Sequence, residues 1–352
     1  MLCVISNEYR PRPGGAGIIA DIFCKDMSAQ IISPLYSNTL TFKYGFRIAK
    51  YFWIIELTVR AFFVSKKASL LINDFGGLIS IFLASFGRLH KFNTIFFLHH
   101  GLQSEGNGKF QNFKTIILYK ILSAETITNI FVSNYIREEI HRESGLWGEA
   151  FYFPLLEYRG VASTDKTSTK NFLRQKLNLS RGLKLVIATR ITKEKFPLES
   201  IDFLEGLSSI LGKIQVNVYG SGNNAYMNRI EKRVDLSKHP INLEFVGLAK
   251  RERVIDAMRL STGVFNPSKL REALPTVGLE AALTLGVYIH YKGYGHHEAN
   301  SFNSAPVFSA DSWTFNEGVR LADLLLKWEK SDINIKSLNP SHEISRLKAY
   351  FQ

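Results

Sequence analysis

Apolar and polar positions alternate along the first half of the chain as short apolar runs separated by longer amphipathic segments. The short runs predict β-strands at residues 2–6, 31–35, 70–73, 94–98, 127–132 and 150–153. The longer segments predict helices at residues 17–28, 77–85, 110–122 and 134–144. Strands that alternate with helices at this spacing are typical of a parallel sheet with helices on both faces. The first half therefore predicts one doubly wound α/β domain.

The same alternation restarts after a polar stretch at residues 159–170, RGVASTDKTSTK. It predicts strands at residues 183–188, 215–219, 242–246, 263–265 and 287–289. It predicts helices at residues 198–211, 226–234, 251–259, 277–285 and 313–327, and a last one at 342–351. A stretch rich in Ser, Thr and Lys favours a linker between two such series.

We therefore expect an N-terminal Rossmann-like domain over residues 1–158, a linker region over 159–182 and a C-terminal Rossmann-like domain over 183–330. The C-terminal helix within residues 331–352 is expected to pack back toward the N-terminal domain. Two doubly wound domains in tandem place a cleft between the carboxyl ends of their sheets, where ligands bind.

Composition supports a globular protein. Of the 352 residues, 45% are hydrophobic and 21% are charged, which excludes disorder as a description of the whole chain. Cys3 and Cys24 lie in apolar segments without a partner at metal-ligand spacing, which predicts a reducing, cytoplasmic location. The N-terminus lacks the pattern of a signal peptide, and no apolar run is long enough for a membrane-spanning helix.

The formal net charge of +13 is spread over both halves of the chain. A basic balance of this kind is found in ordinary soluble enzymes and in proteins that contact an anionic membrane, a phosphorylated substrate or a nucleic acid. No zinc-finger, K-homology or RNA-recognition signature is present, so we expect no nucleic-acid partner.

Two groups of residues follow predicted strands of the first half. Gly14, Gly15 and Gly17 stand between a strand and a helix, where glycines let the backbone approach an anion at a helix N-terminus. A tight turn explains them equally well, and they do not form a dinucleotide-binding fingerprint. His99 and His100 follow the strand at 94–98 and either donate hydrogen bonds to a sugar or phosphate or have a structural role.

The second half offers cations and glycines at equivalent places. Arg190 and Lys195 follow the strand at 183–188, where they either clamp a diphosphate or belong to a solvated loop. Gly220 and Gly222 follow the next strand, and Gly247 ends the one after it.

Two glutamates flank a loop-to-helix turn. Pro275 occupies a favourable first helical position, so Glu272 is predicted on the loop and Glu280 on the helix. The backbone N–H groups near Thr276 and Val277 then lie at a helix N-terminus, which suits phosphate. Carboxylates accept strong hydrogen bonds from sugar hydroxyls. A phosphate-binding site between two carboxylates that can bind sugar hydroxyls indicates a nucleotide sugar as the ligand.

The segment REALPTVGLEAALTLG resembles the E-x7-E signature of retaining GT-B glycosyltransferases, the group 1 superfamily that includes glycosyltransferase family 4. The segments PGGAG, HHG, TRITKEKF, YGSG and FNPS are similar to other landmarks of that family in the same order. The resemblance implies a GT-B fold, in which two doubly wound Rossmann-like domains face a central cleft. It also implies a retaining, metal-independent, hexosyltransferase-type enzyme without a cofactor.

The same resemblance implies roles for single residues. Arg190 and Lys195 would hold the donor diphosphate and stabilise it as leaving group, Glu272 would contact the donor sugar, and His100 would lie near the reacting carbon. Glu280 would bind the nucleotide ribose. The remaining expected nucleotide-sugar contacts are Gly14, Gly15, Gly17, Gly220, Gly222, Val246, Gly247, Pro275, Thr276 and Val277.

The chain departs from the family pattern in places. Ala273 stands where the family often has glycine, and Pro275 removes one N–H that a phosphate would otherwise meet. His296, His297 and Glu298 form either a metal site or a polar loop, and we favour the loop because no further ligand has zinc spacing. We therefore expect no metal.

The implied substrates are a nucleotide-diphosphate sugar and a glycan or lipid-linked acceptor, with bacterial surface polysaccharide assembly (lipopolysaccharide, O-antigen or capsule) as the setting. Residues 41–67 combine Lys43, Arg47, Lys50, Arg60, Lys66 and Lys67 with eight aromatic side chains. This segment predicts a helix that either lies on the anionic inner face of the cytoplasmic membrane, which we favour, or packs on the sheet.

Other functional classes remain open at this point. A GT-B-fold epimerase or phosphorylase is an alternative enzyme, although no motif identifies the pyridoxal-phosphate lysine of a phosphorylase. A non-catalytic nucleotide-sugar-binding subunit is a third reading, against which Arg190, Lys195, Glu272 and Glu280 argue.

Overall fold

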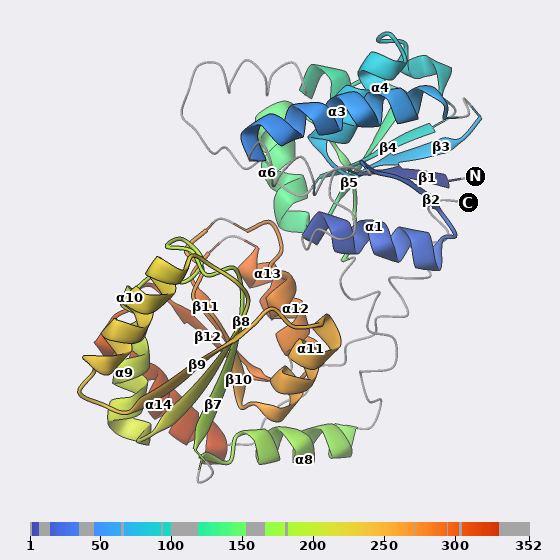
Figure 1. Cartoon of the computed structure of the whole chain (residues 1–352). Coiled ribbons are helices and arrows are strands. Elements are labelled where there is room, and N and C mark those ends of the chain that lie inside the picture. The colour runs from blue at the N-terminus through green and yellow to red at the C-terminus, as the bar shows by residue number, and fades with distance from the viewer. Residues whose placement is uncertain are drawn as a thin grey trace. The chain divides into compact units, whose positions relative to one another are not determined.

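The structure, a computed structural model, describes residues 2–6, 15–34, 46–64, 67–92, 94–99, 119–152, 166–179, 182–270, 272–293, 295–302 and 305–330. The chain divides into two compact units, formed mainly by residues 1–157 and 158–340. Each is an α/β domain with a parallel sheet, as the sequence predicts (Figure 1). The C-terminal helix predicted within residues 331–352 lies outside the described residues.

The N-terminal unit contains, in its described residues, six parallel strands in the order β2-β1-β3-β4-β5-β6. The strands are β1 (Leu2–Ile5), β2 (Gln30–Ile32), β3 (Ser69–Ile72), β4 (Thr94–His99), β5 (Ile127–Phe131) and β6 (Gly148–Ala150). The helices are α1 (Gly15–Asp26), α3 (Phe46–Phe62), α4 (Phe75–Ala84), a 3-10 turn η1 (Leu89–Lys91) and α6 (Asn134–Ser144). Figure 1 shows α3 and α4 together on one face of the sheet and α1 on the other.

Local signals explain where these helices begin and end. The side chain of Asp74 accepts a hydrogen bond from the Gly77 backbone N–H and caps α4, and Ser133 caps α6 in the same way through Ile136. Gly145 ends α6 in the left-handed conformation, with φ of 74°. Among the helices that the structure describes, none has the length and apolar character needed to cross a bilayer.

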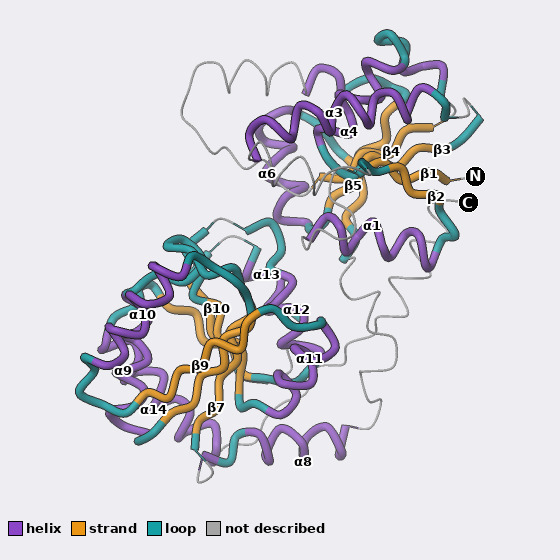
Figure 2. The backbone as a smooth tube through the Cα atoms, in the orientation of Figure 1, coloured by secondary structure: helices purple, strands orange, loops and turns teal. Residues whose placement is uncertain are grey.

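The C-terminal unit also has six parallel strands among its described residues, in the order β12-β11-β10-β7-β8-β9 (Figure 2). The strands are β7 (Leu183–Ala188), β8 (Ile214–Tyr219), β9 (Ile241–Gly247), β10 (Gly263–Asn266), β11 (Val287–Tyr291) and β12 (Val307–Ala310). The helices are α8 (Lys166–Lys176), α9 (Glu199–Leu211), α10 (Asn224–Asp235), α11 (Arg251–Leu260), α12 (Thr276–Leu283), α13 (His296–Asn300) and α14 (Phe315–Lys330). The strand order reverses between β7 and β10, so the loops that follow these two strands diverge and leave a place for a ligand.

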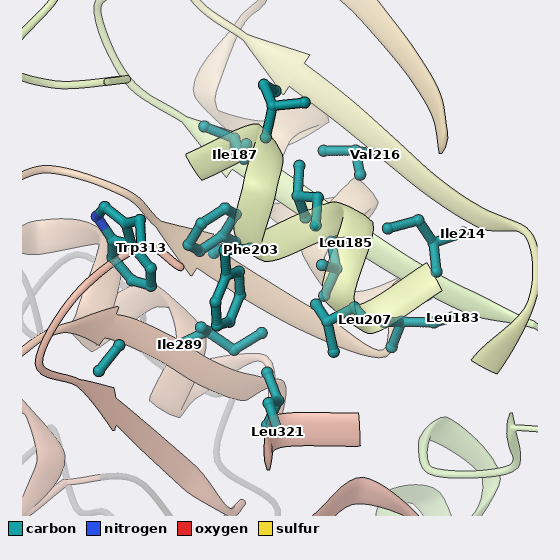
Figure 3. Close-up of a cluster of buried hydrophobic side chains, with 14 of the residues drawn as sticks. Leu183, Leu185, Ile187, Phe203, Leu207, Ile214, Val216, Ile289, Trp313 and Leu321 are labelled. Carbon is teal, nitrogen blue, oxygen red and sulfur yellow. The ribbon is translucent and has the colours of Figure 1, made fainter. Parts of the chain in front are cut away.

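The core of this unit lies between the sheet and helices α9 and α14. Phe203, Phe265 and Trp313 are buried and their rings contact one another, and Figure 3 shows Phe203 beside Trp313. Gly206 allows α14 to approach α9 closely, because a Cβ at this position would lie 2.0 Å from the Phe315 carbonyl oxygen. The indole N–H of Trp313 donates to the Pro267 carbonyl at 2.9 Å. The core thereby anchors the loop that follows β10.

The sequence missed three elements of this unit. Helix α8 lies inside the range 159–182 that was predicted as a linker, and its Leu173 and the adjoining Leu177 are buried. Its sequence, KTSTKNFLRQK, is so polar that composition alone favours a loop. The short elements α13 and β12 were also missed. In the N-terminal unit, residues 119–122 of the helix predicted at 110–122 are helical, and the rest lies outside the described residues.

Candidate functional site

The candidate site is formed by the loops that follow β7 and β10. Residues 190–195, here called the clamp loop, follow β7, and residues 267–275, here called the glutamate loop, follow β10. The backbone N–H of Lys269 donates to the Glu194 carbonyl at 3.1 Å, which joins the two loops. Lys195 Nζ lies 2.5 Å from Glu272 Oε1, and both side chains are largely buried. The structure therefore brings together two of the residues predicted to handle the donor, while Arg190 is exposed at the start of the clamp loop.

The second glutamate pairs with a cation that the sequence analysis did not single out. Glu280 lies on α12 and is 7% exposed. Arg251, the first residue of α11, places Nη2 2.7 Å from Glu280 Oε1. A carboxylate buried to this extent requires a counter-ion or strong hydrogen bonds, and the arginine meets this requirement.

The N-terminus of α12 differs by one residue from the prediction. Pro275 is the cap residue, with φ of −68° and ψ of 112°, and the helix begins at Thr276. The prediction that Pro275 is the first helical residue is therefore wrong, because the ring restricts φ but allows this extended ψ. Pro275 makes no side-chain capping hydrogen bond. The first turn, with Thr276 and Val277, is consequently arranged as expected for a site that attracts an anion.

The glycines after β8 and β9 have identifiable backbone roles. A Cβ on Gly220 would lie 1.8 Å from the Thr189 carbonyl oxygen, and one on Gly222 would lie 2.3 Å from that of Ile191. The two glycines thus let the turn after β8 pack directly against the clamp loop, with a parallel bridge between Ile191 and Gly222. Gly247 has φ of 84°, which favours glycine. Direct contact of these glycines, and of Val246, with a ligand stays a prediction.

A cavity of about 440 Å³ lies between the clamp loop and the start of α10. Its lining includes Lys193, Asn223, Tyr226 and Arg229. Sequence analysis did not predict this cavity, because Tyr226 and Arg229 were assigned only to an amphipathic helix.

A buried polar network supports the glutamate loop from α13 and β11. The Tyr288 hydroxyl and His296 Nδ1 are 2.9 Å apart, and Asn300 Nδ2 is 3.0 Å from His290 Nε2. Burial lowers the pKa of His296 to about 3 and that of His290 to about 4, so both rings are neutral near neutral pH. The backbone N–H of Gly295, directly before His296, donates to the Glu272 carbonyl at 3.0 Å.

These contacts give His296 a supporting structural role. Among the described residues, no group of three or more His, Cys, Asp or Glu side chains is arranged to hold a metal ion. His297 and Glu298 lie on the short helix α13, where the sequence analysis favoured a polar loop.

The predicted sites of the N-terminal unit are described only in part. His99 is buried, its Nε2 lies 2.8 Å from Asn129 Oδ1, and its ring stacks on Phe131. It therefore has the structural role that the sequence analysis left open. His100 and Gly14 lie outside the described residues. Gly15 opens α1, and Gly17 is buried within that helix.

Comparison with known proteins identifies the class of fold. No family model matches the sequence, and no curated protein matches it. HepE of Anabaena, solved with UDP and glucose, is 12% identical over 99% of this chain and 98% of that chain, with a TM-score of 0.68. A glycosyltransferase of Rickettsia africae is 13% identical over 99% and 97%, with a TM-score of 0.64. WaaG, a glycosyltransferase of lipopolysaccharide biosynthesis, is 12% identical over 94% and 93%, with a TM-score of 0.58.

These similarities extend over nearly the whole length of both chains. They agree with the two six-stranded parallel sheets among the described residues. The chain has the GT-B fold of these glycosyltransferases, as the sequence resemblance predicted.

Proposed function

We propose that this protein is a glycosyltransferase that moves a sugar from a nucleotide-diphosphate sugar to a glycan or lipid-linked acceptor. The observation that carries the proposal is the arrangement at the carboxyl edge of the C-terminal sheet. Lys195 and Glu272 meet at 2.5 Å there, and Glu280 projects from a helix that has Pro275 at its cap. Cations, a helix N-terminus and two carboxylates are the groups that a sugar diphosphate requires.

In this proposal the ion pair between Lys195 and Glu272 opens when the donor binds. Lys195 and Arg190 turn to the diphosphate, whose negative charge grows as the glycosidic bond breaks. Glu272 is then available to accept hydrogen bonds from the donor sugar, and Glu280 binds the ribose hydroxyls. The first turn of α12, with Thr276 and Val277, contributes its backbone dipole to the phosphates.

We propose that the transfer retains the configuration of the sugar. The bond between the anomeric carbon and the diphosphate oxygen breaks, and a bond to the acceptor oxygen forms on the same face. The proton of the acceptor hydroxyl passes to the departing diphosphate, so the products are a glycoside and a nucleoside diphosphate. Lys195, Arg190 and the helix N-terminus supply the positive potential, so we propose no metal and no cofactor. His100 is proposed to lie near the reacting carbon.

The proposed acceptor is supported by the similarity to HepE and WaaG and by an exposed surface on helix α3. HepE was solved with UDP-glucose, and WaaG acts in lipopolysaccharide biosynthesis. We place this chain in the same kind of setting, bacterial surface polysaccharide assembly, at the cytoplasmic face of the membrane. A lipid-linked acceptor would require contact with that membrane.

Helix α3 offers a surface for this contact. Trp53, Leu57 and Ala61 form one stripe and are buried. A second apolar stripe is exposed, and it consists of Phe52, Ile55, Val59 and Phe62. Their spacing of three or four residues places them on one face of the helix. One face of the helix therefore packs on the protein, as one interpretation of the sequence predicts, and we propose that the exposed stripe contacts the membrane.

Neighbouring features support the proposal that the partner is an anionic bilayer. Ser80 Oγ contacts the Ile54 carbonyl at 3.2 Å, so α4 lies against α3. Exposed Phe63 follows α3, and exposed Phe86 follows α4. The cations Lys67 and Arg88, exposed just beyond them, favour anionic lipid headgroups.

The experiment that tests the proposed activity is a thermal-shift screen of nucleoside diphosphates and nucleotide sugars, followed by measurement of donor consumption. We expect at least one nucleotide sugar to raise the melting temperature, because a ligand that binds only the folded state stabilises it. We expect donor consumption to continue in EDTA. No shift with any nucleotide would contradict the proposed donor site, and activity that is lost in EDTA and restored by Mn²⁺ would contradict the metal-independent mechanism.

A further inference from the structure

We propose that Arg251 is a positioning residue that holds the Glu280 carboxylate for the ribose diol and so determines discrimination between ribonucleotides and deoxyribonucleotides. The inference rests on the proposed function, because it concerns the nucleotide half of the same site. Arg251 would act through Glu280 and would not itself contact the nucleotide.

The contact between the two side chains is shielded from solvent. Arg251 and Glu280 have side chains that are 21% and 10% exposed, and Nη2 and Oε1 are 2.7 Å apart. The guanidinium nitrogens of Arg251 are buried. An ion pair in this environment is screened far less than one at the surface, so it restricts the glutamate effectively.

The chemistry of the pair leaves room for the ribose. A carboxylate has two oxygens and about four acceptor positions, so it can accept from a guanidinium and from two hydroxyls at once. The guanidinium is planar and permanently charged, so its contact with the carboxylate restricts the orientation of that group. Loss of the arginine would remove this counter-charge from a buried carboxylate and would leave its desolvation cost less compensated.

The helices that carry the pair are joined at their other ends. Lys176 Nζ of α8 donates to the Met258 carbonyl of α11 at 3.0 Å and to the Thr284 carbonyl after α12 at 2.6 Å. The Lys176 amino group therefore links the C-terminal ends of α11 and α12, while Arg251 and Glu280 make a second connection between the two helices. Two connections along the same pair of helices fix their relative position.

The place of Arg251 in the chain also connects two parts of the nucleotide site. Helix α11 follows the turn at Gly247, which the sequence analysis counts among the expected nucleotide-sugar contacts and which we assign to the base. Glu280, which is expected to bind the ribose, lies on the neighbouring helix. The Arg251 side chain extends from the start of α11 to Glu280. It therefore sets the distance between the part of the site that binds the base and the part that binds the ribose.

The test is calorimetry with UDP, GDP and their 2′-deoxy counterparts, on wild-type protein and on Arg251→Gln, Glu280→Gln and the double variant. We expect wild-type protein to prefer the ribonucleotide by about tenfold, the effect of one hydrogen bond to a charged group. Arg251→Gln should reduce this preference to within about twofold, and Glu280→Gln should do the same. The ribonucleotide preference of the double variant should be no lower than that of Glu280→Gln alone, because both substitutions disrupt the same Arg251–Glu280 pair.

Arg253→Gln is the matched control, because it removes one positive charge from an exposed position of the same helix. It should keep the wild-type preference. If Arg251→Gln weakens both forms of the nucleotide equally and keeps their ratio, the arginine contacts phosphate or base directly and the inference is overturned. If wild-type protein binds no ribonucleoside diphosphate of the thermal-shift screen, the proposed nucleotide site fails and the inference fails with it. A wild-type preference that Arg251→Gln leaves unchanged overturns the inference alone.

Discussion

Glu272 and Glu280 lie on one short segment of sequence, yet each is paired with a cation from a different loop. Lys195 of the clamp loop meets Glu272, and Arg251 of α11 meets Glu280. The spacing of the glutamates indicates carboxylates at a loop-to-helix turn, but it contains no information about these long-range partners. The Lys195 pairing also suggests how the clamp is kept in place before a donor arrives.

Lys195 is the residue for which the mechanism predicts the largest effect on turnover. Lys195→Met should lower kcat/KM by about 10²-fold, because a charge contact with the leaving diphosphate is lost in the transition state. Far-UV circular dichroism should remain unchanged. Lys213→Met is the control, since it removes a charge from an exposed position between α9 and β8 and should keep activity within about threefold of wild type. Near-normal turnover of Lys195→Met would remove this lysine from the mechanism.

Lys176 gives a prediction about stability that needs no ligand. Burial and, to a smaller extent, the positive charge of Arg259 together lower the pKa of Lys176 to about 7. The unfolded chain has an ordinary lysine with a pKa of 10.5, so between about pH 7 and pH 10 the unfolded state binds more protons. The contribution of Lys176 to stability therefore rises with pH across this window and is constant below it.

Calorimetric unfolding of wild-type protein and Lys176→Met should show this dependence. The stability of wild type relative to the variant should increase by about 1 kcal/mol per pH unit between about pH 7 and pH 9. Lys184→Met, an exposed change on β7, should give a difference that does not vary with pH. Parallel curves for wild type and Lys176→Met would show that Lys176 titrates normally in the folded protein.

At the scale of elements, the sequence predicts most strands because they are short, apolar and buried. β7 and α6 have the predicted bounds, and most other boundaries differ by one or two residues. Helix α8 could not be recognised, because only Leu173 and Leu177 show its buried side among polar residues. The support that Tyr288 and His296 give to the glutamate loop was also not predictable, because β11 and α13 approach that loop only in the folded structure.

The exposed stripe of α3 leads to a prediction for this element as a whole. Ile55→Ser combined with Phe62→Ser should lower binding to vesicles containing phosphatidylglycerol by about tenfold, because two apolar side chains no longer enter the bilayer. Helix content should be preserved, since both side chains are exposed. Ile210→Ser changes an exposed isoleucine of α9 and should bind as wild type does. Cosedimentation measures the bound fraction, and wild-type protein that stays in solution with these vesicles would contradict membrane contact.

At the scale of the whole molecule, the order of the motifs carries more information than any single one. The five similar segments lie in two series of strands and helices, and the structure confirms the GT-B fold that they imply. The places of the candidate site residues in the second domain were predictable, because these residues follow successive strands of one sheet. The pairing of Glu272 with Lys195 and of Glu280 with Arg251 was not, because ion pairs depend on side-chain reach across loops. His100 and Gly14, the predicted contributions of the first domain, remain predictions.

The most direct test of the proposed donor site measures whether Glu280 binds the ribose while Glu272 contacts the donor sugar. The nucleoside diphosphate identified by the screen and its sugar conjugate are titrated by calorimetry into Glu280→Gln and Glu272→Gln. The account predicts that Glu280→Gln weakens binding of both ligands by about 10- to 100-fold, because a charged acceptor of the ribose hydroxyls is lost. Glu272→Gln should leave the bare diphosphate within about threefold of wild type and weaken only the sugar conjugate. Equal losses for both variants on the bare diphosphate, or no loss for either, would contradict it.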